Sequence, residues 1–202
     1  KLGGGDVKLY SGIALALPMF NESIFIITVI ILSALSGIVF LATYYFIKYY
    51  RKGIDFKYNK QGILRGAALA ILISLYLFVL LSSGLVSWGY ALIVSIPLLF
   101  GTIFIAFEKG IRKEFFLEKI KLKDLEEDEI VAFDFMNEKE KKEIGKGFKG
   151  VFGEKEKKEL EKKGIKELLV YRNLPRFGVF IFIGVVLALA FPEFGSFLSG
   201  GF

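Results

Sequence analysis

Cysteine and histidine are both absent from this chain of 202 residues. Their absence excludes disulfides, zinc sites made of Cys and His, thiol nucleophiles and a Ser–His–Asp triad within the chain. Any catalysis by these residues therefore has to use carboxylates, lysines or hydroxyl groups.

Charge is missing from three long stretches, residues 24–47, 66–107 and 177–192. The whole chain is 54% hydrophobic, which is more than a soluble domain usually carries. About 20 apolar residues are enough for a helix to cross a bilayer, and lipid leaves a single segment no other way to satisfy its backbone. A chain of this size also has too small an interior to bury so much apolar surface. We therefore expect a polytopic membrane protein and not a soluble protein with buried core helices.

The pattern of apolar and charged stretches divides the chain into three parts. Residues 1–107 are expected to form membrane helices, residues 108–176 a charged module, and residues 177–202 a last membrane helix with an outer tail. The helices predicted in the first part cover residues 7–18, 23–47, 67–86 and 90–107. The expected fold class is thus mainly α, a membrane helix bundle with a small cytoplasmic α+β insertion before the last membrane helix.

The positive charges predict which side of the cell membrane each loop faces. If all five predicted helices cross, every Lys and Arg falls on one side, and the other side carries only Glu22 and Glu193. Loops rich in Lys and Arg are retained in the cytoplasm. The clean separation favours a true crossing at residues 7–18, short as it is. It also places Asp6 and the charged module on the cytoplasmic side.

Local patterns within the charged module predict two strands and a helix. "DEIVAFDF" (residues 128–135) alternates as a strand does, and "IKELLVYR" (residues 165–172) has the pattern of a second strand. Between them, "EKEKKELEKKG" (residues 154–164) has helical spacing and ends at Gly164. Positive and negative charges nearly balance here, so we expect no nucleic-acid partner.

Small residues inside the predicted helices indicate helix packing. Gly37, Gly101 and Gly184 are expected to be contacts between helices, since a missing side chain lets two backbones approach. Pro97 also lies inside a predicted helix, where a bundle tolerates it if neighbours satisfy the freed carbonyl.

Three glycines precede Asp6 at the start of the first predicted helix. One interpretation is structural, because a carboxylate at a helix N-terminus caps the first N–H groups and interacts favourably with the helix dipole. The other is catalytic. Two carboxylates that share one proton can activate water for attack on a peptide carbonyl, since like charges a few ångströms apart cannot both ionise. The residues alone leave both interpretations open.

At this point the sequence resembles a known family. "GGGDVKL" (residues 3–9) resembles the GxGDxKL motif of the type IV prepilin peptidases, membrane aspartyl proteases that include the archaeal preflagellin peptidases. "GEKEKKELEKKGIKELLVYRNLPRFGVFIFIG" (residues 153–184) is similar to the C-terminal part of the archaeal members. The middle of the chain matches only in its pattern of spans. The resemblance implies an endopeptidase that removes the short leader (class III signal) peptide of pilin-like and archaellin-like precursors at the cytoplasmic membrane face, with no cofactor and no metal.

The resemblance also implies roles for individual residues. Asp6 would be one of two catalytic carboxylates, and Gly3 and Gly5 would shape the approach of the substrate strand. Lys8 matches the lysine of the motif and is a secondary candidate, with an interfacial lysine that snorkels to the headgroups as the alternative. The second aspartate of the family lies upstream of GxGD and nothing precedes Lys1, so the chain is expected to be the C-terminal portion of a longer peptidase and to be inactive alone. Four other acids do not follow the family pattern and are expected to be surface charges: Asp55, Asp124, Asp128 and Asp134.

A non-catalytic membrane protein is the alternative function, either a transporter or a subunit for pilus or archaellum assembly. Transporters commonly bring ionisable groups or broken helices to mid-membrane. The internal predicted spans, residues 23–47, 67–86 and 90–107, contain no charge, which argues against coupling to ions or protons. A degenerate member of the peptidase family that acts as a scaffold is a further alternative.

Overall fold

The structure is a computed structural model that describes residues 3–21, 23–84, 87–125, 129–137, 141, 160–165 and 167–198. It is mainly helical and consists of two compact units. The first unit combines Lys1–Glu108 with Arg176–Phe202, and the second is Lys109–Pro175.

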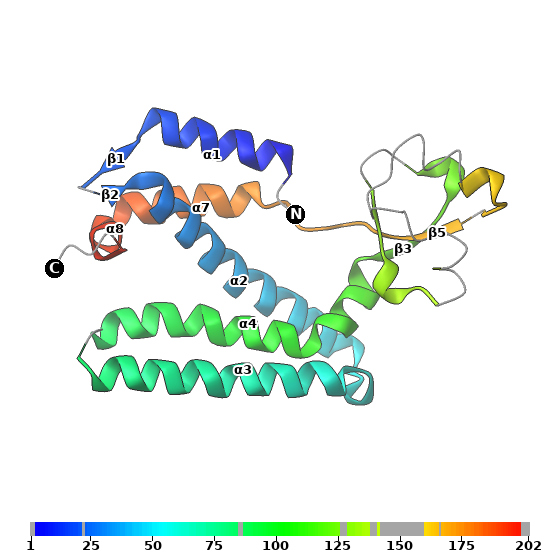
Figure 1. Ribbon diagram of the computed structural model, residues 1–202, viewed down its shortest axis with the longest axis horizontal. Helices are drawn as coiled ribbons and strands as arrows, with labels where there is room; N and C mark the ends of the chain where they lie inside the picture. Colours follow the sequence, from blue (N-terminus) through cyan, green and yellow to red (C-terminus); the bar gives the residue numbers. More distant parts are fainter. Residues whose placement is uncertain are drawn as a thin grey trace. The chain divides into compact units, whose positions relative to one another are not determined.

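The first unit is built from helices that run alternately in opposite directions (Figure 1). The helices are α1 (Gly4–Ala16), α2 (Phe25–Lys52), α3 (Phe56–Ser82), α4 (Trp88–Phe115), α7 (Gly178–Ala190) and α8 (Pro192–Leu198). The last residues of α4, from Lys109 onward, belong to the second unit. A short antiparallel pair of strands, β1 (Met19–Phe20) and β2 (Ser23–Ile24), connects α1 to α2.

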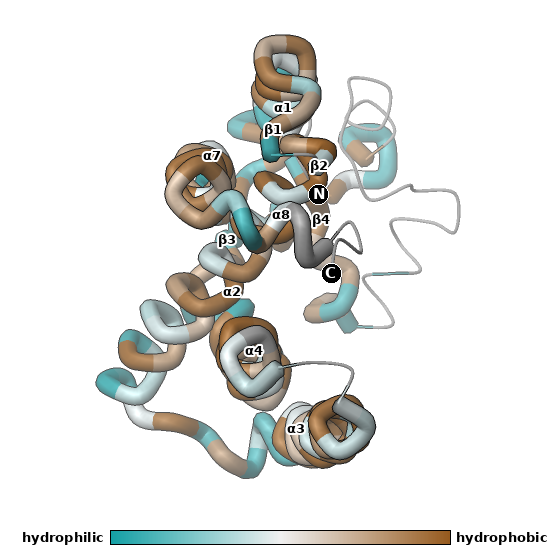
Figure 2. Tube along the Cα trace, turned by 90° about the vertical axis from the view of Figure 1, so that its left-hand side faces the viewer, coloured by the Kyte–Doolittle hydropathy of each residue, from teal (hydrophilic) through white to brown (hydrophobic). Residues whose placement is uncertain are grey.

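Three helices are long and apolar enough to cross a membrane, namely α2, α3 and the part of α4 from Ala91 onward. Figure 2, in which α3 and α4 are seen almost end-on, shows apolar residues on the turns of all three helices. On α3, the large apolar side chains of Ile71, Leu75 and Phe78 are mostly exposed, as expected of a surface that contacts lipid. These three helices confirm the prediction of apolar helices long enough to cross a membrane.

The two shorter helices α1 and α7, of which α7 is apolar, are a different case. Both α1 and α7 contain 13 residues and are therefore about 20 Å long. That length is below the hydrocarbon thickness of about 30 Å. The crossings at α1 and α7 therefore stay predictions.

Several predicted helix boundaries are wrong. α2 continues past residue 47 to Lys52, α3 begins at Phe56 and not at residue 67, and α4 continues past residue 107 to Phe115. Hydropathy marks only the part of a helix that lies in lipid, whereas the helix itself continues into water wherever charged residues keep helical spacing. The first helix, α1, begins at Gly4 and not at residue 7.

α7 packs directly on α2. A Cβ built on Gly184 would lie 2.0 Å from Ser33 Oγ and 2.8 Å from the carbonyl oxygen of Val29. A Cβ on Gly37 would lie 3.3 Å from the Phe177 ring. The core beside this contact contains buried apolar residues of α2, α7 and α8, namely Phe25, Val29, Leu32, Ala188 and Phe194. Both glycines are the helix contacts that the sequence predicts.

α3 and α4 lie side by side (Figures 1 and 2) and approach through glycines. A Cβ on Gly62 would lie 2.6 Å from the carbonyl oxygen of Ala106, and one on Gly66 would lie 2.7 Å from that of Thr102. Gly101 lies on the α2 side of α4, where a Cβ would be 3.6 Å from Ile38. The prediction for Gly101 is thus confirmed, while Gly62 and Gly66 were not predicted.

The second unit contains a three-stranded antiparallel sheet in the order β3-β5-β4. Its strands are β3 (Leu117–Lys121), β4 (Ile130–Val131) and β5 (Glu167–Tyr171), accompanied by the 3-10 helices η1 (Leu122–Asp124) and η2 (Phe133–Phe135). Leu168 and Val170 of β5 point into a core that also contains Ile120 and Leu160. The side of the membrane on which this unit lies remains a prediction.

The strand predictions for this unit are confirmed in part. β5 confirms the strand at residues 165–172, whereas the strand at residues 128–135 is correct only for Ile130–Val131, since η2 follows. β3 was missed. Of the helix predicted at residues 154–164, residues 154–159 lie outside the described part. Gly164 has a φ of +75°, which fits its predicted place at the end of that helix.

Candidate functional site

Asp6 lies in the first turn of α1 as its third residue. The N-cap is Gly3, which has no side chain to contribute, and the backbone N–H of Gly3 donates to Asp6 Oδ2 at 3.2 Å. The expectation that Asp6 is itself the N-cap is therefore wrong by three positions, because the helix begins among the glycines. The carboxylate still satisfies one of the N–H groups that a helix start leaves unpaired.

The side chain of Asp6 belongs to the inner stripe of α1. Tyr10, Ile13 and Leu17 follow it at intervals of four, three and four residues, which keeps all four on one face of a helix. These three apolar residues pack against the core of the first unit. Asp6 is partly buried, whereas Gly5 and Val7 on either side of it are exposed. The acid therefore continues the face by which α1 contacts its neighbours.

The carboxylate also lies beside the first residue of α7. A Cβ built on Gly178 would lie 3.9 Å from Asp6 Oδ1. Since Gly178 begins α7 and Asp6 is in the first turn of α1, both helices start next to this carboxylate. Figure 1 shows the same arrangement, with α1 and α7 running in the same direction.

The other residues of the predicted motif are on the surface. A Cβ on Gly5 would meet nothing within 4 Å, so packing gives no reason for a glycine there. Lys8 is exposed and lies about 200° around the helix from Asp6, at about 100° per residue. The structure thus does not bring Lys8 together with Asp6. The substrate-approach role of Gly3 and Gly5 and the accessory role of Lys8 stay predictions.

Of the other acids singled out in the sequence, those that the structure describes lie in other elements than Asp6. Asp55 is the N-cap of α3, where its Oδ1 accepts from the Tyr58 N–H at 2.8 Å, and it is not hydrogen-bonded to Asp6. An acid directly before a helical pattern is a recognised signal of an N-cap. This signal was not used at Asp55, because the start of the helix was predicted at residue 67. Asp124 and Asp134 belong to η1 and η2 of the second unit, and Asp128 lies outside the described residues. Within the described part, no second carboxylate is hydrogen-bonded to Asp6.

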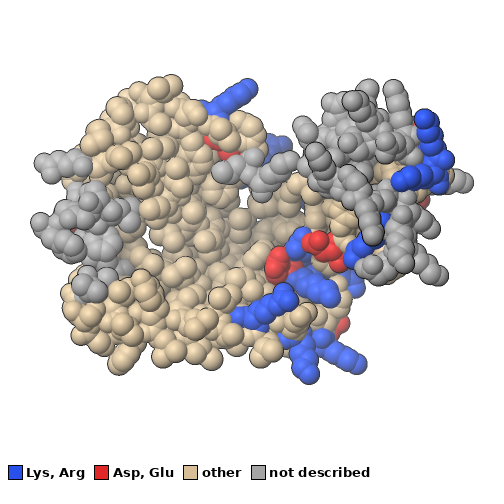
Figure 3. All heavy atoms as spheres, in the orientation of Figure 1, with Lys and Arg blue, Asp and Glu red and all other residues tan. Residues whose placement is uncertain are grey.

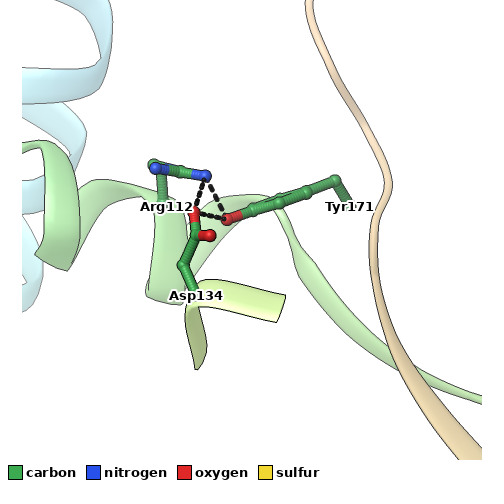
Figure 4. Close-up of polar contacts among 3 residues, drawn as sticks. All are labelled: Arg112, Asp134 and Tyr171. Carbon is green, nitrogen blue, oxygen red and sulfur yellow. Dashed lines mark hydrogen bonds and ion pairs between the residues drawn. The ribbon is translucent and has the colours of Figure 1, made fainter. Parts of the chain in front are cut away.

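A polar cluster that the sequence did not predict lies in the second unit (Figure 4). Arg112 Nη2 is 2.8 Å from Asp134 Oδ2 and also donates to Tyr171 Oη, and the Tyr171 hydroxyl lies 3.3 Å from the same carboxylate oxygen. The guanidinium lies 4.7 Å from the centre of the Tyr171 ring, a favourable cation–π distance. Burial raises the pKa of Tyr171 to about 12, and Arg112 partly opposes this rise. The cluster joins the end of α4 to η2 and β5.

Arg172, the residue after Tyr171, forms an ion pair of its own. Arg172 Nε lies 2.5 Å from Glu129 Oε1, and the Glu129 side chain is only 11% exposed. Its other oxygen, Oε2, is buried without a hydrogen-bond partner in the part of the chain that the structure describes. Like the Arg112 cluster, this pair connects segments that are far apart in sequence.

Metal ligands are not grouped in the described residues. No set of three or more Asp or Glu side chains there could hold a metal ion.

Comparison of the chain with protein-family models, with curated protein sequences and with solved structures gives no match. The family resemblance at residues 3–9 therefore stays a prediction.

Proposed function

We propose that this protein acts as a membrane aspartyl endopeptidase in which Asp6 supplies one of the two carboxylates that activate water. The position of Asp6 carries this proposal. The acid is on the inner stripe of the short helix α1, partly buried, and beside the start of the apolar helix α7. An ionisable group in that position within a membrane protein is a functional candidate by default.

The chemistry needs a pair of carboxylates that holds one proton. The ionised carboxylate takes a proton from water as the oxygen of that water attacks the peptide carbonyl, and the protonated carboxylate donates to the carbonyl oxygen. Transfer of a proton to the peptide nitrogen then lets the C–N bond break. Since no described acid is hydrogen-bonded to Asp6, the partner carboxylate has to come from another segment or another chain.

The proposed substrates are pilin-like and archaellin-like precursors with a short leader, as the resemblance of residues 3–9 to the GxGD motif implies. Their leader would be cleaved at the cytoplasmic face of the membrane. Gly3 and Gly5 are exposed, and Gly5 has open space around it. An extended substrate backbone can approach a glycine more closely than any other residue.

The test compares two acids in the protein as its gene encodes it. Membranes that contain the wild type, Asp6→Asn or Asp55→Asn are incubated with a class III precursor, and leader removal is followed on gels. We expect Asp6→Asn to abolish cleavage with unchanged expression, because an amide cannot accept the proton of water. Asp55→Asn should retain cleavage, since an Asn at an N-cap replaces Asp well. Cleavage by Asp6→Asn would remove Asp6 from the mechanism.

The second candidate is a non-catalytic membrane protein in which Asp6 only completes the start of α1. The hydrogen bond from the Gly3 N–H to Asp6 favours this function. The same assay separates the two, because in this case wild-type membranes leave the precursor intact and Asp6→Asn changes only stability.

A further inference from the structure

The connection between α2 and α3 gathers positive charge at one end of the long helices. Residues 48–65 contain six Lys and Arg and a single acid, Asp55. The carboxylate of Asp55 is held by the first turn of α3 through the Tyr58 N–H. In Figure 3, Lys and Arg side chains are concentrated where α2 ends and α3 begins, and uncharged residues cover the rest of these helices.

Most of these cations make no contact with acids. All six are exposed, and within the described part of the chain four of them form no ion pair. The four are Arg51, Lys57, Lys60 and Arg65. A net positive surface without its own counter-charges is suited to an anionic partner.

On α3, the cations lie on the side that faces away from the protein. Lys57, Lys60 and Leu64 follow one another at helical spacing, and all three are exposed. Gly62 and Gly66, which contact the backbone of α4, lie on the opposite face. These lysines therefore face the same surroundings as the apolar residues further along the helix.

The exposed face of α3 changes from charged to apolar within about one turn. Lys60 and Leu64 are separated by about 6 Å along the axis, and Ile71, Leu75 and Phe78 continue the same exposed stripe. A soluble acidic protein would not match this change, because the apolar part of the stripe would remain in water. The headgroup and the chains of a lipid follow one another in the same order.

Exposed aromatic rings flank the cations. Tyr50 near the end of α2 is 68% exposed, and Phe56 at the start of α3 is 64% exposed. Aromatic side chains concentrate at the headgroup level of membranes. We propose that this surface, formed by Arg51, Lys57, Lys60 and Arg65 with Tyr50 and Phe56, binds the headgroups of anionic lipids in the adjoining leaflet.

Native mass spectrometry tests this surface on the whole protein. The protein is purified in dodecyl maltoside and titrated with dioleoyl phosphatidylglycerol or dioleoyl phosphatidylcholine. We expect tighter binding of phosphatidylglycerol, with an affinity that falls as salt rises. The Lys57→Gln/Lys60→Gln variant should weaken phosphatidylglycerol binding by about 25-fold, since each Lys near an anionic surface contributes about fivefold. Phosphatidylcholine binding should not change.

Three controls make the outcome specific. The Lys57→Arg/Lys60→Arg variant keeps the charge and should keep the affinity, whereas Lys162→Gln/Lys163→Gln removes two exposed charges in the second unit and should leave phosphatidylglycerol binding unchanged. Soluble glycerol 3-phosphate should not compete at equal concentration, because it lacks the chains that contact the apolar stripe. The proposal is overturned if Lys57→Gln/Lys60→Gln binds phosphatidylglycerol like wild type, if Lys162→Gln/Lys163→Gln weakens the binding as much, or if glycerol 3-phosphate competes equally. None of these outcomes depends on peptidase activity.

Discussion

The carboxylate of Asp6 faces the first residue of α7, where a Cβ on Gly178 would lie 3.9 Å from Asp6 Oδ1. This distance is an ordinary van der Waals contact, so a methyl group fits there. A longer side chain would extend toward the carboxylate and fill the space beside it.

If Asp6 is catalytic, substitution of Gly178 should affect cleavage according to side-chain size. Gly178→Ala is expected to cleave precursor leaders within about twofold of wild type. Gly178→Leu should cleave at least about tenfold more slowly, because misplacement of reacting groups by about 1 Å already costs more than that. The measurement is the initial rate of leader removal in membranes.

Gly12→Leu is the matched control for this substitution. Gly12 is on α1 with nothing within 4 Å of an added Cβ, so the same increase in size should leave the rate unchanged. Equal rates for Gly178→Leu and wild type would show that substrate does not use the space beside Asp6.

Gly184→Ala should separate α7 from α2. The added Cβ would lie 2.8 Å from the Val29 carbonyl oxygen, which is backbone and cannot rotate away. Overpacking of this kind costs about 1–3 kcal/mol. We expect a lower midpoint of thermal unfolding in detergent, followed by circular dichroism at 222 nm.

The Ser33→Ala background sharpens this test. Ser33 Oγ is the nearest atom to the added Cβ, at 2.0 Å, but its removal leaves the backbone contact in place. The double variant should therefore remain destabilised relative to Ser33→Ala alone. Full recovery would mean that only the hydroxyl limits the approach. Gly12→Ala, in open space, should instead stabilise by about 1 kcal/mol through helix propensity.

Tyr171 should lose its phenolic proton at a higher pH than an ordinary tyrosine. Its pKa is raised from 10.0 to about 12, mainly by burial, so the folded unit holds the phenolic proton more tightly than the unfolded chain. The stability that this provides is complete below pH 10 and is lost as the pH rises from 10 to about 12. The absorbance of tyrosinate at 295 nm, titrated for wild type minus Tyr171→Phe, should show one group with a midpoint near 12.

Unfolding the protein provides the control for this titration. In denaturant, the same difference curve should move to a midpoint of about 10, the ordinary value for tyrosine. A midpoint near 10 in the folded protein would contradict the buried position of Tyr171 in the Arg112 cluster.

Part of this structure is determined by local sequence. The uncharged runs predict apolar helices because lipid excludes charge and unpaired backbone, and three of those helices are long enough to cross. The alternation in "IKELLVYR" predicts β5, and Gly164 marks the end of the helix before it. Each of these features depends on residues that are neighbours in the chain.

The helix ends and the polar clusters depend on more than local pattern. α3 begins at Phe56, with Asp55 as its cap, although hydropathy alone placed its start eleven residues later. Arg112 meets Asp134 and Tyr171 across 22 and 59 positions of the chain. Spacing along the sequence contains no information about such contacts, because they form only when the sheet brings its strands together.

Asp6 shows the same difference between what local sequence predicts and what packing adds. The sequence alone predicts that Asp6, after three glycines, lies at the start of a helix, because glycine and a charged residue interrupt the hydrophobic pattern there. The tertiary structure adds that the face shared by Asp6, Tyr10 and Ile13 packs against the rest of the first unit, and that Gly178 lies beside the carboxylate. Those relations come from the packing of α1 against α2 and α7, which buries one face of a helix and so fixes where each of its side chains points.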